Sequence, residues 1–472
     1  MPPEINILAF QRGSVTAPAG CGKTQLIADT LALHTGPKPA LILTHTNAGV
    51  AALRARMSRA NIPNASYVIA TLDGFTMKLI SRFPARSGHD PAIMLLENPS
   101  HDYPAIRASA IALLSGRHLD NVLRASYAYL LVDEYQDCNE AQHAIVTWLA
   151  QALRTYVLGD PMQAIFNFGG NRLVDWAAEV IVHFPPIGAL STPWRWLRAG
   201  REEFGRWLLQ ARGLLEAGQP IDLRTAPGEV EWVRIQAATA DAQRRTAALV
   251  RLQDGESALI IGDSRNTAGR QRLTSQTAGA TTVESVDLPD LISFARTFVP
   301  TVEQSLNQLV NFAASVMTGV GAAAFLPRVE IIRNGRNRTA PTPAEHCAIA
   351  FLDTLTHGSA AELLQCLSGQ QGAHVYRPEL LRCCLAALRV ATTGGQTLYA
   401  AAAQIRERNR MLGRPLSRRA VGSTLLLKGL EAEIAVILQP DEMNSKNLYV
   451  AMTRGAKKLL ICSQTPILQP PR

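Results

Sequence analysis

The chain has 472 residues, which is too long for one compact core, so roughly two to four domains are expected. An apolar fraction of 47% is ordinary for a globular protein and excludes general disorder. The 47 basic and 38 acidic residues give a net charge of +9, an excess that fits a polyanionic partner without requiring one.

The N-terminal part of the chain, up to about residue 190, alternates short apolar runs with helical patterns. Each run is continuously apolar, which is typical of parallel strands covered on both faces. The helical patterns between them favour β–α–β units. Prolines at 84, 91, 99 and 104 break the alternation, so a small helical insertion is expected there. The predicted strands are Gly13–Thr16, Ala40–Thr44, Tyr67–Thr71, Tyr129–Val132 and Thr155–Leu158.

The second half of the chain also alternates strand-like runs with helical patterns, but less regularly. Residues 185–225 have a helical pattern, and residues from about 270 to 410 are again mostly helical. Strand-like runs lie between and after these stretches, so a second α/β unit interrupted by a helical insertion is expected. The predicted strands are Glu229–Ile235, Ala258–Ile261, Ile434–Leu438 and Lys458–Cys462.

Membrane and secretory segments are not expected. No stretch approaches the roughly 18 uncharged apolar residues that a transmembrane helix needs. The N-terminus, MPPEINILAF, has no basic region followed by an apolar core, so it is no secretory signal. The seven cysteines are irregularly spaced and show neither a zinc pattern nor a disulfide framework. Reduced thiols in a cytoplasmic protein, with no membrane partner, are therefore expected.

Residues 17–24 read APAGCGKT, between a strand-like GSVT and the helical pattern TQLIADTLALH. This is a phosphate-loop pattern in its strand–loop–helix context. Small residues let the backbone curl so that its N–H groups face phosphates at the helix N-terminus. Lys23 would reach the β- and γ-phosphates, and the Thr24 hydroxyl would bind Mg²⁺. The other loop residues expected around the nucleotide are Ala19, Gly20, Cys21 and Gly22.

Residues 128–138, AYLLVDEYQDC, form an apolar run that stops at two adjacent acids. A parallel strand that ends in acids places them at the carboxyl edge of the sheet, where phosphates bind in such folds. Asp133 would then hold the Mg²⁺ ion, and Glu134 would orient the attacking water. An acid pair that caps a helix N-terminus is the alternative at this point.

Further motifs follow in a fixed order up to residue 461, and together with the phosphate loop they resemble the UvrD/Rep-like helicases of superfamily 1. The resemblance implies ATP and Mg²⁺ as cofactors and two RecA-like α/β domains. These would be residues 1–185, with an insertion at about 76–125, and residues 186–268 with 411–472, interrupted by a mostly helical insertion at 269–410. The motifs are LILTHTNAGVAALRARM, TLDGF, DEYQDCN, VLGDPMQAIFNFGG, ALSTPWRW, LLLKGLEAEIAVIL and NLYVAMTRGAKKLLI.

The resemblance also implies roles at the nucleotide. Gln163 would sense the γ-phosphate, and Arg195 and Arg454 would reach it from the second α/β domain. A cation at that place offsets charge on the transferring phosphoryl group. Trp194 takes the place of a tyrosine that packs on adenine, and Glu431 lies where an acid contacts the ribose. Gln25 replaces an arginine that is common directly after the loop.

Single-stranded DNA, or a junction of single- and double-stranded DNA, is the partner that the resemblance implies. The expected contacts are His45, Thr71 and Phe168, with His45 and Phe168 stacking on bases; ordinary packing is the alternative for these two. Asp73 stands where a histidine is usual, and Gly169 follows the third motif where an arginine is usual. The ATP side is therefore intact by motif, whereas the DNA side is altered.

Two functions are compatible with these motifs. The first is an ATP-dependent translocase and helicase on single-stranded DNA, with the 3′→5′ direction that the resemblance implies. The second is a DNA- or nucleotide-sensing ATPase within a larger complex, with little unwinding of its own. The short insertions of this chain favour the second function, because they look similar to those of the helicase-like partner of a nuclease in anti-phage systems such as Gabija. A metabolic phosphate-loop kinase would not need the later motifs in order, and no further cluster of acids and lysine indicates a nuclease within this chain.

Overall fold

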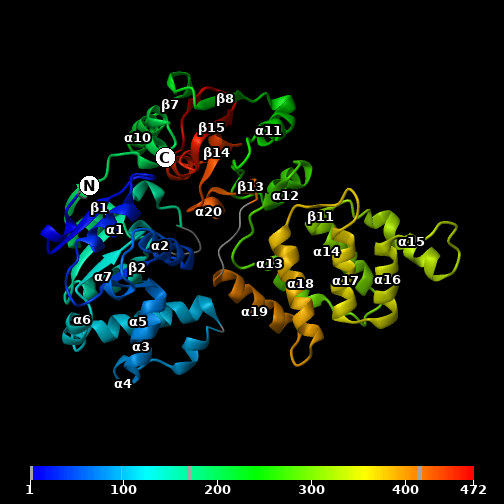
Figure 1. The fold of residues 1–472 in the computed structure, drawn as a ribbon, viewed down its shortest axis with the longest axis horizontal. Helices are drawn as coiled ribbons and strands as arrows, with labels where there is room; N and C mark the ends of the chain where they lie inside the picture. Colours follow the sequence, from blue (N-terminus) through cyan, green and yellow to red (C-terminus); the bar gives the residue numbers. More distant parts are fainter. Residues whose placement is uncertain (1–3, 97, 167–171, 412–416, 472) are drawn as a thin grey trace. The chain divides into compact units, whose positions relative to one another are not determined.

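The computed structural model describes residues 4–96, 98–166, 172–411 and 417–471 (Figure 1). The chain divides into two compact units. The first unit consists of Met1–Glu229, Met443–Lys457 and Ile467–Arg472, and the second consists of Val230–Glu442 and Lys458–Pro466.

The first unit is built on a six-stranded sheet in the order β3-β2-β4-β5-β1-β6, with every pair parallel. Alternate residues of β2 face opposite sides, so that Leu41 and Leu43 pack in one hydrophobic cluster and Ile42 in another. Covering both faces explains why these strands read as continuous apolar runs. The strands are β1 (Arg12–Thr16), β2 (Ala40–Thr44), β3 (Tyr67–Thr71), β4 (Tyr129–Val132), β5 (Arg154–Gly159) and β6 (Pro186–Ala189).

Helices cover both faces of this sheet. The helices α1 (Lys23–Ala32) and α2 (Asn47–Arg59) pack in the cluster that contains Ile42. The opposite cluster takes side chains from α3 (Leu72–Arg82), α5 (Pro99–Ser115), α6 (Asp120–Ser126) and α7 (Glu140–Leu149). Other elements of this unit are α4 (Pro84–Ser87), η2 (Asn64–Ser66), η4 (Tyr135–Asp137), η5 (Pro161–Gln163), α9 (Trp194–Arg198), α10 (Glu202–Glu216) and α21 (Ser445–Met452).

The second unit contains another six-stranded sheet, in the order β10-β13-β9-β14-β15-β8. Four of its neighbouring pairs, β10–β13, β13–β9, β9–β14 and β15–β8, are parallel. Its strands are β8 (Val230–Arg234), β9 (Ala258–Ile261), β10 (Ala280–Thr282), β13 (Arg419–Gly422), β14 (Ala432–Ile437) and β15 (Gly455–Ser463), and its helices include α11 (Ala240–Ala248), α12 (Thr267–Gln276) and α20 (Thr424–Leu427).

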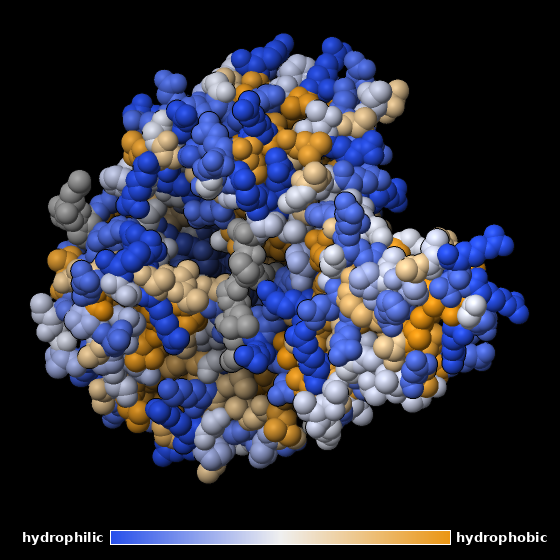
Figure 2. Space-filling view, turned by 45° about the vertical axis from the view of Figure 1, so that its right-hand side comes forward, coloured by the Kyte–Doolittle hydropathy of each residue, from blue (hydrophilic) through white to orange (hydrophobic). Residues whose placement is uncertain are grey.

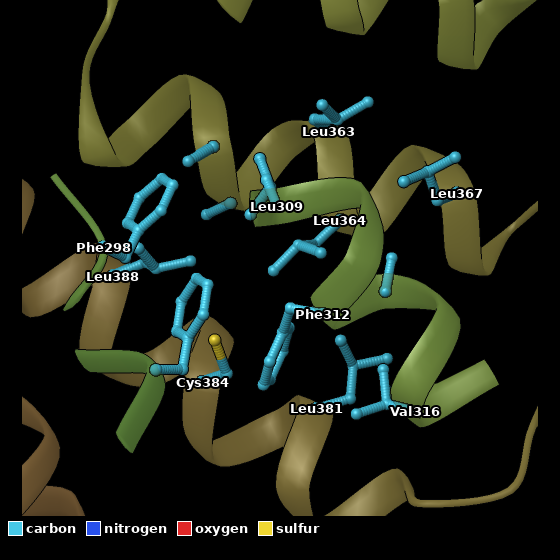
Figure 3. Close-up of a cluster of buried hydrophobic side chains, with 14 of the residues drawn as sticks. Phe298, Leu309, Phe312, Val316, Leu363, Leu364, Leu367, Leu381, Cys384 and Leu388 are labelled. Carbon is cyan, nitrogen blue, oxygen red and sulfur yellow. The ribbon is translucent and has the colours of Figure 1, made fainter. Parts of the chain in front are cut away.

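A helical insertion between β10 and β13 has a core of its own. Figure 3 shows Phe298, Phe312 and Leu388 converging with leucines from several helices, all of them buried. This separate core lets the insertion fold around its own apolar cluster. Its helices are α13 (Pro289–Thr297), α14 (Ser305–Val316), α15 (Ala322–Arg333), α16 (Pro343–Thr354), α17 (His357–Ser368), α18 (Pro378–Thr392) and α19 (Leu398–Met411), with a short hairpin of β11 (Met317–Thr318) and β12 (His374–Val375).

The predicted fold class is confirmed, since two sheets of parallel strands carry the described α/β units. The nine predicted strands all exist, with ends shifted by three residues at most. Within the two six-stranded sheets, three further strands, β6, β10 and β13, were not predicted because proline, glycine, threonine or arginine interrupts their apolar character. Residues 186–189 lie in a stretch predicted to be helical, and they extend instead because they pair with β1.

The compact units and the predicted domains divide the chain differently. Residues 186–229 and 443–457 lie in the first unit, whereas the predicted second domain includes both. The physical reason is that β6 extends the first sheet and that α10 and α21 pack on each other within this unit. The division into RecA-like domains at 185 and 411 stays a prediction.

One prediction about cysteines is wrong. Cys347 on α16 and Cys366 on α17 form a disulfide across two packed helices. Their separation of 19 residues carried no recognisable pattern because the pairing depends on how the helices pack. The other five cysteines lie outside this disulfide and are buried.

The described part of the chain has no helix that is both long and apolar enough to cross a bilayer. The face shown in Figure 2 is mostly hydrophilic, with apolar residues scattered across it. Most of the large apolar side chains are instead buried in the clusters around the two sheets and in the helical insertion.

Candidate nucleotide-binding site

The phosphate loop runs from β1 to the start of α1 in two left-handed glycine turns. Gly20 has φ 71° and Gly22 has φ 90°, a region that glycine enters without steric cost. A Cβ atom on Gly20 would lie 2.5 Å from Cζ3 of Trp196, so a larger residue does not fit. Gly22 is the N-cap of α1, and no side chain caps this helix. The first N–H groups of α1 are thus left for an anion.

Lys23 brings the loop and the acid pair together. Its Nζ lies 3.0 Å from Oδ1 of Asp133 and 2.5 Å from Oε1 of Glu134. Burial would lower the pKa of Lys23, but the two carboxylates outweigh it and raise that pKa above its ordinary value. Burial also raises the pKa of Asp133, which the Lys23 charge opposes. A cation and two carboxylates predicted from separate motifs therefore meet at one place.

Glu134 is held in a conformation that few non-glycine residues adopt. Its φ is 54°, a left-handed value that costs roughly 1–2 kcal/mol. Its N–H donates to Oδ1 of Asp133 at 2.9 Å, and its Oε2 accepts from Nε2 of Gln136 at 2.5 Å. Its side chain makes no capping hydrogen bond to the short helix η4 that follows. The arrangement directs the carboxylate toward Lys23 instead, which disfavours the helix-cap alternative.

A second set of buried polar groups lies beside the acid pair. The carbonyl oxygen of the Gln136 side chain accepts from the N–H of Asp160 at 3.1 Å, and Gln163 Nε2 donates to Asp160 Oδ2 at 3.1 Å. Asp160 is fully buried, and Arg212 of α10 supplies the compensating charge at 2.8 Å. Burial would lower the pKa of Arg212, but the Asp160 carboxylate raises it. Gln163 is thus joined to Glu134 through Asp160 and Gln136.

The helices α9 and α21 pack against the phosphate loop within the first unit. The N–H of Ala19 donates to the Tyr449 hydroxyl at 3.0 Å, and the N–H of Arg195 donates to the Gly20 carbonyl at 3.1 Å. The Arg195 guanidinium donates to the Thr453 carbonyl at 2.6 Å. Tyr449 was not predicted as a site residue, although it lies inside the last motif, because its contact with the loop spans 430 residues.

Trp194 begins α9, and Arg454 follows the C-terminal end of α21. Arg454 is 3% exposed, and its Nε donates to the Val450 carbonyl at 2.8 Å. Trp194 is 36% exposed, and a Cβ atom on Gly22 would lie 3.0 Å from its Cδ1. Trp194 therefore stands beside the loop with an accessible ring, as a base-stacking residue requires.

The remaining predicted nucleotide residues have simpler surroundings. Gln25 donates to Asp29 one helical turn further along α1, at 2.6 Å. Burial raises the pKa of Cys21 to about 12, so the thiol is neutral and packs as a small apolar side chain. Glu431 is an exposed residue just before β14, in the second unit.

The predicted DNA contacts are only partly described. His45 is half-buried, with its ring 6.1 Å from that of Phe166. The Thr71 hydroxyl accepts from the N–H of Gly74 at 3.0 Å and so caps α3. Phe168 lies outside the described residues.

Asp73, the unexpected acid near these residues, is neutralised. Arg107 of α5 binds both of its carboxylate oxygens at 2.7 Å, and Gln142 of α7 adds a weaker bond at 3.3 Å. The negative charge is therefore tied to the helices that cover the sheet.

Residues 92–174 match the model of the UvrD/REP helicase N-terminal domain, a span that includes β4, the acid pair and Gln163. Over 92 residues the chain is 33% identical to the "Probable DNA helicase II homolog" of Mycoplasma capricolum, covering 19% of this chain and 12% of that protein. It is also 33% identical over 67 residues to a Leuconostoc mesenteroides protein named as one component of an ATP-dependent helicase/nuclease, covering 14% and 5%.

Among solved structures, the Pif1 helicase from Candida albicans aligns with a TM-score of 0.42 and 10% identity, over 98% of this chain and 93% of that one. The matched segments span no more than about an eighth of the two curated relatives named above. The resemblance to UvrD/Rep-like helicases that the motifs predict is nevertheless confirmed, by the family model over residues 92–174 and by these helicase relatives.

Proposed function

We propose that the chain is an ATP hydrolase that uses the energy of hydrolysis to move along single-stranded DNA and to unwind duplex DNA, 3′→5′ as in the family it resembles. The observation that carries this proposal is the meeting of Lys23 with Asp133 and Glu134 beside an uncapped helix N-terminus. That combination offers backbone N–H groups and a cation to phosphates, and carboxylates to a metal ion.

Each group has a definite task in this proposal. Lys23 leaves the carboxylates for the β- and γ-phosphates when nucleotide binds, which frees Asp133 to serve, together with the Thr24 hydroxyl, as an oxygen ligand. These hard oxygen donors suit Mg²⁺, which when bound would neutralise developing charge on the phosphates. Glu134, held by Gln136 at 2.5 Å, orients the attacking water and accepts its proton.

The arginines and Gln163 supply the second half of the site. Arg195 and Arg454 stabilise charge on the γ-phosphoryl group, and Gln163 reports its presence through Asp160. Trp194 stacks on the base, Gln25 lies beside the phosphates, and Glu431 contacts the ribose. The loop contacts of Arg195 and Trp194 support their part of this assignment.

Single-stranded DNA, or its junction with duplex, is the proposed substrate. The net charge of +9 favours a polyanion, and the matched relatives are named as helicases. His45, Thr71 and Phe168 are the proposed contacts. A cytoplasmic location is part of the proposal, because ATP is the proposed source of energy.

A second function is favoured by the names of two relatives, from Leuconostoc mesenteroides and Syntrophomonas wolfei, which are both described as components of an ATP-dependent helicase/nuclease. The chain would then be a DNA- or nucleotide-sensing ATPase with a nuclease partner, as in bacterial anti-phage systems, and would unwind little alone. Its test is strand separation by the isolated chain.

The deciding experiment is the ATP hydrolysis rate with and without single-stranded DNA, each with Mg²⁺ and with excess chelator. We expect Mg²⁺-dependent hydrolysis that single-stranded DNA stimulates. A hydrolysis rate that DNA does not change, together with no strand separation, would favour the sensing function. No hydrolysis under any condition would refute both.

A further inference from the structure

The outer edge of β3 is an open strand edge in the first sheet. β3 stands at the end of the sheet order and pairs with β2 alone. Within the described residues, the backbone groups of Tyr67 to Ala70 make no hydrogen bond outside this sheet. An edge strand of this kind presents unpaired N–H and C=O groups to another strand.

A groove of about 680 Å³ runs along this edge. Four consecutive β3 residues, Tyr67 to Ala70, line it, so the groove follows the strand rather than crossing it. Its walls come from helices on opposite faces of the sheet, because α2 packs in one hydrophobic cluster and α3 in the other. Phe75 and Tyr127 form an aromatic side, with ring centroids 6.4 Å apart. The volume lies in the range of established ligand pockets.

The charge of the groove is positive. Arg54 of α2 and Lys78 of α3 both line it, and both are exposed. Neither makes an ion pair with any described residue, and the lining residues include no carboxylate. Nearby, Asp73 already binds Arg107 and does not balance these cations.

We propose that this groove binds an extended segment of a partner protein, which adds beside β3 as a seventh strand and places acidic side chains on Arg54 and Lys78. Main-chain hydrogen bonds to β3 supply the affinity, and the two cations supply the selectivity. The open edge and the groove along it favour a peptide over a nucleic acid, because a nucleic acid has no row of backbone N–H and C=O groups to pair with the strand.

The two cations impose a spacing on the partner. Successive side chains of a strand point to opposite faces of the sheet. Arg54 and Lys78 come from helices on opposite faces, so the two acids must be separated by an odd number of positions. Charge attraction alone would not require an odd number of positions between the two acids.

The test uses the full chain and two fluorescent octapeptides of identical composition, made of valine, threonine and two glutamates. In one the glutamates are three positions apart, and in the other four. Fluorescence anisotropy should show about fivefold tighter binding of the first peptide. The double variant Arg54→Glu/Lys78→Glu should weaken that binding about tenfold and remove the preference, whereas Arg251→Glu, an exposed arginine of the second unit, should change neither.

Two further readouts separate strand addition from other modes. N-methylation of alternate peptide amides should abolish binding, and bound peptide should slow amide hydrogen exchange across Tyr67–Thr71. Equal affinity for the two spacings would overturn the proposal, as would the absence of binding by both peptides. If instead a labelled decathymidylate binds and loses affinity in the double variant while the peptides do not bind, the groove is a nucleic-acid site and the proposal is wrong.

Discussion

The proposed ATP side and the proposed DNA side of the first unit differ in what holds their polar residues in place. At the phosphate loop the contacts join distant parts of the chain, as between Lys23 and Asp133 or between Ala19 and Tyr449. At the proposed DNA side, Thr71 caps its own helix and Asp73 is bound by Arg107 and Gln142, which are 34 and 69 residues away.

This difference explains why one side keeps the family motifs and the other departs from them. A residue fixed from several directions, such as Asp160 between Gln136, Gln163 and Arg212, leaves no room for a substitute. A helix cap needs only a short oxygen-bearing side chain, and an acid can be compensated by one nearby arginine. The following variants test two expectations. Residues on the ATP side should depend on one another, whereas residues on the DNA side should act independently.

The largest effect is expected for Lys23→Ala. The change removes the cation that both Asp133 and Glu134 face, and with it the proposed phosphate contact. Hydrolysis should fall by at least about 10³-fold. Lys446→Ala, at an exposed position, serves as the control in the same ATPase assay, and circular dichroism checks that both variants fold. Normal turnover by Lys23→Ala would refute the phosphate-loop assignment.

A comparable effect on turnover, but not on binding, is expected for Arg454→Ala. An arginine that stabilises the transferring phosphoryl group is worth about 10³–10⁵ in rate. We expect kcat to fall by that order while nucleotide affinity stays within a few-fold, as measured by single-turnover kinetics and equilibrium binding.

The contrary outcome is also informative, because Arg454 is buried and bonded to the Val450 carbonyl at the end of α21. A large loss of thermal stability with unchanged kcat would make Arg454 a structural residue that stabilises the end of α21. Arg454→Lys keeps the charge and tests how far the guanidinium geometry matters.

Most of the fold could be predicted from the sequence, and the exceptions have two causes, weak local patterns and packing between distant segments. Strands such as β2, covered on both faces, carry a strong apolar signal, whereas β6, β10 and β13 contain proline, glycine, threonine or arginine and show none. The contact between Lys23 and Asp133 was predictable because each of the two residues lies in a motif. Tyr449, Asp160 and Arg212 were missed because their roles come from packing of α10 and α21, which no local pattern records.

A stability effect is expected at the buried pair that supports Gln163. Arg212→Ala leaves the fully buried Asp160 without its cation, which should lower the free energy of unfolding by about 3–5 kcal/mol. The control lies on the same helix: Arg206 pairs with Glu202 in an exposed i,i+4 contact, so Arg206→Ala should cost about 1 kcal/mol or less. Denaturant titration measures both, and equal losses would show that burial of Asp160 adds nothing.

The smallest effect is expected at the altered DNA side, for Asp73→Asn. The change keeps the size of the side chain, removes one negative charge and frees Arg107 from a two-pronged ion pair that is about one-fifth exposed. Fewer negative charges near a polyanion should strengthen binding, so affinity for labelled oligothymidylate should rise about threefold, with a steeper dependence on salt. ATP hydrolysis without DNA should not change, because no described contact joins Asp73 to Lys23 or Asp133. If basal hydrolysis fell instead, the two sides would be coupled through α7, and the local compensation inferred for Asp73 would be wrong.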